Sequence, residues 1–182
     1  MNKVEPIRNT EKIEEMKKQL QNNHRNYILF LLGINCGLRV SDLLKLKVKD
    51  IKNSSHIRLR EKKTNKYKKH FLNDSLKEKL NGYIVKENLK NEDYIFQSRE
   101  GENEPISRIQ AYRILNKAAA KIGLEKIGTH SLRKTFGYHH YQKHKDIATL
   151  QLIFNHSNPA TTLEYIGINQ DMIDNSVKNF LL

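Results

Sequence analysis

The sequence predicts an α+β domain that is mainly helical and contains one small antiparallel sheet. Over most of the chain, apolar residues recur three or four positions apart, which is the spacing of an amphipathic helix. Segment 45–70 breaks this pattern with two short runs typical of strands around a polar turn. The 182 residues contain no internal repeat or low-complexity linker, so one continuous domain, 1–182, is expected.

The N-terminal part of the chain predicts two helices and a third, shorter one. Thr10 is expected to cap the first helix, whose apolar face consists of Ile13, Met16 and Leu20. Residues 27–34 are apolar on every side, which indicates a buried central helix, and Gly37 ends it. Ser41 or Asp42 is expected to begin the short helix that follows.

Segment 45–70 is strongly basic, with eleven Lys or Arg residues against only two acidic ones. Within it, residues 57–60 and 67–72 are predicted strands, joined by the polar turn around residues 64 and 65. The segment is therefore predicted to form a small basic hairpin.

The remaining chain predicts further helices. Two apolar stripes at helical spacing indicate one helix each: Leu76, Leu80, Tyr83 and Ile84, then Ile109, Tyr112, Leu115, Ala119 and Ile122. Residues 131–144, 147–154 and 171–180 are also expected to be helical. Pro159 is expected to mark a turn between the last two.

Charge and hydropathy exclude several classes of function. Lys plus Arg (33) exceed Asp plus Glu (20), so the net charge is +13 and the pI is near 9.7. This excess indicates a polyanionic partner, with nucleic acid the leading candidate. The longest apolar run, 27–32, is far shorter than the roughly 20 residues that span a bilayer, so no membrane span is expected. The N-terminus lacks the apolar stretch of a secretory signal, so we expect a cytoplasmic protein.

Thiol and zinc chemistry are not expected. Cys36 is the sole cysteine and ends an apolar helical run, so it is interpreted as a small buried hydrophobic residue. A zinc site is disfavoured because no cysteine pair exists. The histidines show no ligand-like pairing apart from the adjacent His139 and His140.

Three short motifs contain candidate site residues. Arg39 follows an apolar helix and a glycine, at a junction between a loop and a helix. His130 and Arg133 are neighbours on one helical face, and such a pair can bind one phosphate. His156 and Tyr165 are separated by a segment that contains a proline. Taken singly, a surface arginine, an exposed polar pair and a core tyrosine are the simpler interpretations.

In their order, these motifs resemble the catalytic signature of the tyrosine recombinases, also called phage integrases. The signature has an Arg in G-L-R-x-S-[DE]-L, a Lys in a β-hairpin turn, H-x-x-R, a His or Trp in a G-H-S-like segment, and then a Tyr. The matching positions are Arg39, Lys63, His130, Arg133, His156 and Tyr165. The resemblance extends from about residue 13 to about residue 180. Asn155 stands where the family usually has glycine, so a different backbone turn is expected there.

The resemblance implies DNA strand transfer through a covalent 3′-phosphotyrosine, with no metal and no other cofactor. Tyr165 is the implied nucleophile. Arg39 and Arg133 would contact the non-bridging phosphate oxygens and stabilise the charge that develops there. The signature supplies these cations without the acidic cluster that a Mg²⁺ ion would need.

The resemblance also implies roles for the other signature residues. His130 is the implied general base or hydrogen-bond relay for Tyr165, and His156 is a further donor to the scissile phosphate. Lys63 occupies the position of the hairpin lysine that protonates the leaving 5′-oxygen, with neighbouring lysines as alternatives.

Double-stranded DNA is the implied partner, and a homo-oligomer, a tetramer on paired sites, is the implied assembly. Contacts to DNA phosphates are expected from Lys45, Lys47, Lys49, Lys52, Arg58, Lys68 and Lys69. The last predicted helix has an apolar side formed by Met172, Ile173, Val177 and Phe180. This C-terminal tail is expected to pack on its own core or, as family tails often do, on a neighbouring protomer.

The domain organisation and the activity leave alternatives open. Family members usually carry an N-terminal core-binding domain, which we expect this chain to lack. It is expected to be either an excised catalytic domain or a short stand-alone member such as the fimbrial phase-switch recombinases. The start Met1-Asn2-Lys3 favours the second. A non-catalytic DNA-binding relative and a type IB topoisomerase-like enzyme are the alternative functions.

Overall fold

The computed structural model describes residues 4–52, 54–60, 67–168, 174–175, 177–178 and 180–181. In chain order its elements are α1 (Thr10–Leu20), α2 (His24–Cys36), α3 (Val40–Leu43), the 3-10 helix η1 (Val48–Asp50), β1 (His56–Arg60), β2 (Tyr67–Phe71), α4 (Asp74–Lys86), α5 (Arg108–Ala120), α6 (Thr129–His144), α7 (Ile147–Phe154) and α8 (Pro159–Ile166). The predicted class, mainly helical α+β with a small antiparallel sheet, is confirmed. Within the described ranges, every helix is too short or too polar to cross a lipid bilayer.

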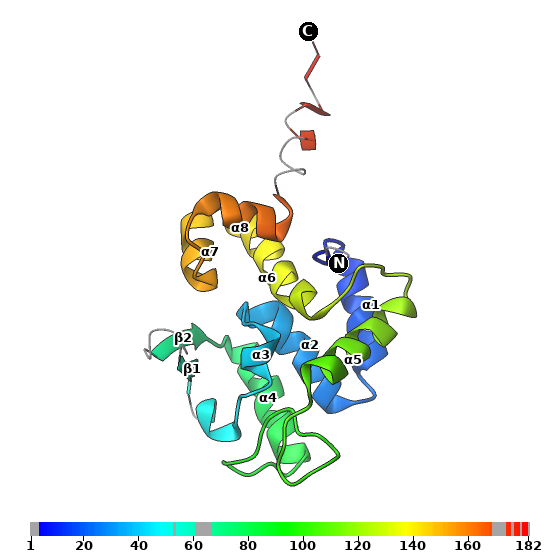
Figure 1. Ribbon diagram of the computed structural model, residues 1–182, viewed down its shortest axis with the longest axis vertical. Coiled ribbons are helices and arrows are strands. Elements are labelled where there is room, and N and C mark those ends of the chain that lie inside the picture. Colours follow the sequence, from blue (N-terminus) through cyan, green and yellow to red (C-terminus); the bar gives the residue numbers. More distant parts are fainter. Residues whose placement is uncertain are drawn as a thin grey trace.

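Helix α2 lies at the centre of the fold and packs against α1, α4 and α6 (Figure 1). Residues 28–33 are all buried, which confirms the predicted central helix. The helix begins earlier than predicted because the Asn23 side chain caps it by accepting a hydrogen bond from the Asn26 N–H. It ends at Gly37, whose φ of 64° is left-handed, and a Cβ there would meet the Phe136 ring at 2.6 Å.

Helix α1 has the predicted buried face but a different cap. Its buried residues are Ile13, Met16 and Leu20. Asn9, rather than Thr10, caps the helix, and its Oδ1 accepts a hydrogen bond from Glu11 N at 2.7 Å. Asparagine is the stronger N-cap of the two, so the helix begins one residue after it.

Helix α3 begins at Val40, so the prediction that Ser41 or Asp42 begins it is wrong. No side chain caps this helix. Leu38 and Val40 are both buried and flank the exposed Arg39. Burial of these two apolar residues therefore determines where α3 begins, and it leaves the arginine facing outward.

The basic hairpin forms as predicted. Strands β1 and β2 pair antiparallel, with Arg58 opposite Lys69, and Ile57 is fully buried beneath them. The turn, residues 61–66, lies outside the described residues, and the prediction for Lys63 lies there with it.

Helices α4 and α5 differ in how well their buried faces were predicted. The predicted stripe of α4 is buried, as Leu76, Leu80, Tyr83 and Ile84. The buried residues of α5 are Ala111, Leu115, Ala118 and Ala119. Ile109 and Tyr112, predicted to be buried, are 64% and 48% exposed, and Ile122 follows the end of the helix. A face of small alanines lets α5 lie close to α1 and α6, so this face displaces the larger side chains to the surface.

Helices α6 and α7 lie close to their predicted positions. Helix α6 begins at Thr129, two residues early, because the Gly128 N–H donates to the Ser131 hydroxyl at 3.1 Å. Helix α7 has the predicted bounds, and Asp146 caps it.

Helix α8 was not predicted, and the turn assigned to Pro159 is wrong. Pro159 is the first residue of α8, directly after the N-cap Asn158, whose side chain accepts from Thr161 N at 2.8 Å. Proline suits this position because the N–H that it lacks would have no partner within the helix. Half of the helix predicted at 171–180 falls outside the described residues.

Helix α6 joins two apolar clusters. The larger cluster surrounds α2, and a smaller one contains Leu150, Phe154, Ile166 and Ile168. Gly137 of α6 faces the smaller cluster, where an added Cβ would lie 2.6 Å from Ile166 and 2.7 Å from Phe154. Helix α8 therefore lies directly against α6, and this contact positions the residues described next.

Candidate active site

The structure brings together five of the six residues that match the signature. Arg39 is the N-cap of α3, His130 and Arg133 lie in the first turns of α6, His156 follows α7, and Tyr165 lies near the end of α8. Their segments are far apart in the chain, and the packing of α3, α7 and α8 around α6 makes them neighbours.

Tyr165 is half-buried, and its hydroxyl lies beside another of these residues. The hydroxyl oxygen lies 3.4 Å from His130 Nδ1. Burial raises the pKa of Tyr165, while the positive charges of Arg133 and Arg39 oppose that rise. The phenol is therefore protonated at neutral pH, and the groups that can take its proton or stabilise its anion lie beside it.

His130 is poised to accept a proton. Its pKa is lowered from 6.5, first by desolvation and then by the positive charges of Arg108, Arg133, Lys134 and Arg39. The imidazole is therefore neutral at pH 7, and one of its two nitrogens carries a lone pair.

Arg133 is buried, with 4% of its surface exposed, and is held by two main-chain oxygens. Its two terminal nitrogens donate to the carbonyls of Gly37 and Phe154, both at 2.7 Å. These carbonyls lie at the C-terminal ends of α2 and α7, where helices leave acceptors unpaired and carry partial negative charge. Desolvation lowers the pKa of Arg133 to about 10, so it remains charged at neutral pH.

Arg39 lies at the mouth of the site. It is exposed and lines a cavity of about 180 Å³ with Arg108, His130 and Arg133. Among the described residues, its side chain has no hydrogen-bond or ion-pair partner, so its guanidinium is available to an anion in this cavity.

His156 packs against Tyr165 and contacts the hydroxyl of Thr162. Its ring meets the Tyr165 ring edge-on, with centroids 5.2 Å apart, and its Nδ1 lies 3.0 Å from the Thr162 hydroxyl. Desolvation lowers its pKa, and the charges of Arg133 and Arg39 lower it further. Asn155, just before it, adopts φ 54° and ψ 47°, a left-handed conformation that suits glycine best and is tolerated by asparagine. Asparagine therefore fits the left-handed backbone at this position, where the family usually has glycine.

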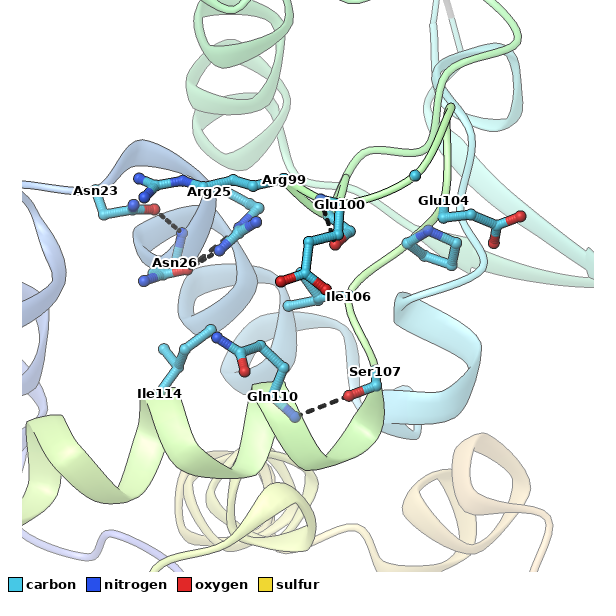
Figure 2. Close-up of a pocket in the computed structure, with 13 residues that line it drawn as sticks. Asn23, Arg25, Asn26, Arg99, Glu100, Glu104, Ile106, Ser107, Gln110 and Ile114 are labelled. Atoms are coloured by element: carbon cyan, nitrogen blue, oxygen red, sulfur yellow. Dashed lines mark hydrogen bonds between the residues drawn. The ribbon is translucent and has the colours of Figure 1, made fainter.

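A larger cavity, about 610 Å³, lies elsewhere and contains none of these residues (Figure 2). Arg25 and Arg99 line it together with Glu100 and Glu104. Arg25 is already bonded to the Gln97 carbonyl and to Asn26. The larger cavity thus pairs its arginines with acidic residues, whereas the smaller one is lined by three arginines and His130 and by no acidic residue.

The predicted phosphate-binding residues fall into two groups. Lys49 and Lys47 make ion pairs with Glu92 at 2.8 and 3.5 Å, and Lys52 contacts Asn91. Lys45, Arg58 and Lys69 are exposed, as Lys49 and Lys52 are, but their side chains make no such contact among the described residues. Lys68 lies in β2, but its side chain is outside the described residues. The hairpin and Lys45 therefore present the more available positive charge.

Comparison with known proteins identifies the family. The family model described as Phage integrase family matches residues 8–172, most of the chain. The chain belongs to the phage integrase family, the tyrosine recombinases. Members of this family are enzymes that cleave and rejoin DNA, and this recombinase has five of the six residues that match the signature in one site.

Relatives of two lengths match this recombinase. It is 52% identical over 181 residues to probable integrase/recombinase YoeC of Bacillus subtilis (strain 168), covering 99% of this chain and 98% of that protein. It is 30% identical over 151 residues to the type 1 fimbriae regulatory protein FimE of Escherichia coli (strain K12), covering 80% and 75%. Tyrosine recombinase XerC of Caldanaerobacter subterraneus subsp. tengcongensis is 29% identical, and the match covers 91% of this chain but only 49% of that protein.

Solved structures share the fold. The crystal structure of XerA recombinase has a TM-score of 0.79 at 21% identity and covers 97% of this chain and 65% of its own. XerH recombinase bound to palindromic difH substrate, a post-cleavage complex, has a TM-score of 0.78 at 22% identity and covers 98% and 54%. The recombinase therefore spans about half to two thirds of these chains.

The structure adds three residues that sequence reasoning missed. Arg108 lines the Arg39 cavity, Lys134 lies with its Nζ 5.2 Å from the centre of the Tyr165 ring, and Thr162 contacts His156. No sequence signal separates Arg108 from the other eight arginines. The sequence shows Lys134 next to Arg133 and Thr162 three residues before Tyr165, but these positions indicate no role without the packing of α6 on α8.

Proposed function

We propose that the chain carries out site-specific recombination through a 3′-phosphotyrosine on Tyr165. The observation that carries this proposal is the position of the Tyr165 hydroxyl, 3.4 Å from His130 Nδ1 and within the influence of the Arg133 charge. A phenol beside a neutral imidazole and near a guanidinium has both an acceptor for its proton and a cation that favours its anion.

In the proposed step, the Tyr165 oxygen bonds to the scissile phosphorus while the bond from phosphorus to the 5′-oxygen of DNA breaks. The phenolic proton passes to His130, and the 5′-oxygen takes a proton, for which Lys63 is our candidate from its sequence position. One phosphoester bond replaces another, so no external energy is needed. Religation runs the same step in reverse with a new 5′-hydroxyl.

Two arginines and a second histidine would stabilise the transition state. Arg39 and Arg133 are assigned to the non-bridging oxygens, where a guanidinium can form two parallel hydrogen bonds. Arg133 has five N–H groups and uses two of its nitrogens for main-chain carbonyls, so further donors remain for phosphate. His156, against the Tyr165 ring, is assigned as a further donor to the same phosphate.

Duplex DNA is the proposed partner, and a tetramer on paired sites is the proposed assembly. XerH is described as bound to difH substrate, and a lambda integrase dimer as bound to a COC′ core site. The net charge of +13 and the exposed Arg58 and Lys69 of the hairpin support DNA binding. Val177 and Phe180 of the C-terminal tail are 59% and 68% exposed, which suits docking on a neighbouring protomer, whereas Met172 and Ile173 lie outside the described residues.

A nicked suicide substrate tests this function. The wild-type protein should form a covalent protein–DNA adduct, and Tyr165→Phe should bind DNA normally but form none. Retarded DNA without an adduct in the wild type would indicate the non-catalytic DNA-binding alternative. Relaxation of supercoils without exchange of strands between sites would indicate the type IB topoisomerase-like alternative.

A further inference from the structure

Thr162 is a buried polar residue next to the site that the proposed step does not use. Its exposed fraction is 0%, and it lies in α8 three residues before Tyr165, so the two side chains are on neighbouring positions of one helical face. The His156 ring contacts both of them, Thr162 through Nδ1 at 3.0 Å and Tyr165 through an edge-on ring contact. One helix therefore carries the nucleophile and a hydroxyl that holds the neighbouring imidazole.

The hydrogen bonds around the Thr162 hydroxyl determine which partner donates. The hydroxyl oxygen lies 3.4 Å from the main-chain oxygen of Asn158 and 3.0 Å from His156 Nδ1. A carbonyl can only accept, and a hydroxyl has one proton. The Asn158 carbonyl belongs to the N-cap of α8, so it accepts the first main-chain bond of the helix and does not depend on the hydroxyl proton. The proton can therefore go to His156 Nδ1, the nearer of the two contacts.

We infer that Thr162 is a positioning residue for recombination, whose hydroxyl donates a hydrogen bond to His156 Nδ1 and so holds the imidazole with Nε2–H presented to the scissile phosphate. The inference rests on the proposed function. Nε2 and Nδ1 lie on different edges of the ring, so holding Nδ1 against α8 leaves the Nε2 edge for a ligand. The His156 ring meets the ring of Tyr165, the proposed nucleophile, edge-on at 5.2 Å, so it lies next to the group that attacks the phosphate.

The arrangement also ties His156 to the nucleophile. Because Thr162 and Tyr165 belong to the same helix, a shift of α8 that moves the hydroxyl of Tyr165 also moves the partner of His156. The second donor to the phosphate and the attacking oxygen thus keep their relative position, and a misplacement of about 1 Å can cost about 100-fold in rate.

Single-turnover adduct formation on the suicide substrate tests the role of the hydroxyl. Thr162→Val keeps the shape of the side chain but removes the hydroxyl, and we expect adduct formation to slow about 10- to 100-fold with DNA affinity unchanged. Thr162→Ser keeps the hydroxyl and should restore the rate to within about threefold of the wild type. In a His156→Ala background, Thr162→Val should cause no further loss, because the residue that it positions is absent.

The adjacent threonine is the matched control. The Thr161 hydroxyl lies in the same helical turn, is exposed and bonds to Asn158 Oδ1 at 3.0 Å, without contact to His156. Thr161→Val therefore makes the same chemical change and should leave the rate within about twofold. Equal rates for Thr162→Val and Thr161→Val would overturn the inference.

The hydrogen-bond direction has its own measurement in the wild-type protein. Nitrogen-15 NMR of the neutral His156 ring should show an unprotonated Nδ1 and a protonated Nε2, and the opposite tautomer would overturn the inference. This measurement decides the matter even if Thr162→Val fails to fold. Failure of the proposed function would appear separately, as a wild-type protein that forms no adduct.

Discussion

At the scale of single residues, Arg133 serves both the fold and the site. It ties the C-terminal ends of α2 and α7 together through the carbonyls of Gly37 and Phe154, and it stacks on the Phe154 ring at 4.3 Å. These contacts compensate for the burial of its charge. They also hold the guanidinium beside the Tyr165 hydroxyl before DNA arrives, which is how a preorganised site stabilises developing charge.

Arg133→Lys should therefore damage both stability and cleavage. A single ammonium cannot reach both carbonyls, so one is left without a donor, and we expect a loss of about 1–3 kcal/mol in the free energy of unfolding. Adduct formation should slow on the order of 10²- to 10³-fold. Urea unfolding and the suicide-substrate assay measure the two effects. The same exchange at the exposed Arg113 is the control, and wild-type cleavage by Arg133→Lys would contradict our assignment.

The acid limb of the pH–rate profile reports the proton acceptor. His130 must be neutral to take the proton from Tyr165, and its pKa lies below the usual 6.5 because of burial and nearby cations. The rate of adduct formation should be flat from about pH 7 to pH 8 and should fall as the pH drops through that lowered pKa. Single-turnover rates from pH 5 to 8 check this, and a rate that rises on acidification would exclude His130 as the base.

At the scale of elements, the contact of α6 with α8 determines where the nucleophile lies. Gly137 leaves no room for a Cβ, which would meet Ile166 at 2.6 Å. Helix α8 can therefore pack on α6 at a distance that places Tyr165 next to His130 and Arg133. Gly137 of α6 and Gly82 of α4 both lie within helices, but of these two only Gly137 has neighbouring side chains in the place of a Cβ.

Gly137→Ala should destabilise the protein and misplace the nucleophile. Overpacking at this contact should cost about 1–3 kcal/mol of stability, and displacement of α8 should slow adduct formation by about 10-fold or more. Gly82→Ala is the control, because an added Cβ there meets no atom within 4 Å. This second change should stabilise the protein by about 0.5–1 kcal/mol, with cleavage unaltered. Thermal unfolding of both variants distinguishes a steric clash of the added Cβ from the general effect of replacing glycine by alanine in a helix.

At the scale of the whole molecule, the excess of positive charge is distributed unevenly. Lys47 and Lys49 lie beside Glu92, whereas Arg58 and Lys69 face each other across the hairpin and are exposed. Lysines that are already paired with Glu92 should therefore contribute less to DNA binding than the net charge of +13 suggests. The exposed basic residues of the hairpin should contribute more.

The salt dependence of DNA binding measures this distribution. Arg58→Gln should reduce the slope of log K against log salt concentration by about 0.9, as expected for one lost phosphate contact. Lys49→Gln should change the slope less, because Glu92 already neutralises that ammonium. Fluorescence anisotropy at several salt concentrations gives both slopes. Equal changes would mean that the ion pair with Glu92 opens on binding.

The sequence by itself determined the fold class, the hairpin and most helices, because helical periodicity, strand composition and caps act over a few residues. It failed where a local signal had two meanings. Pro159 is compatible with a turn and with the first position of a helix, and Asn158 decides for the helix. Ile109 and Tyr112 have helical spacing, but alanines occupy the buried side of α5.

The tertiary structure alone decided how the site residues are held. The signature predicted which residues matter, but the partners of Arg133 lie 96 and 21 residues away, and His130 contacts Tyr165 across 35 residues. Such contacts depend on the packing of helices around α6, which no local pattern encodes. Arg108 and Thr162 entered the site for the same reason: a side chain acquires its electrostatic and hydrogen-bonding environment only when distant segments exclude water around it.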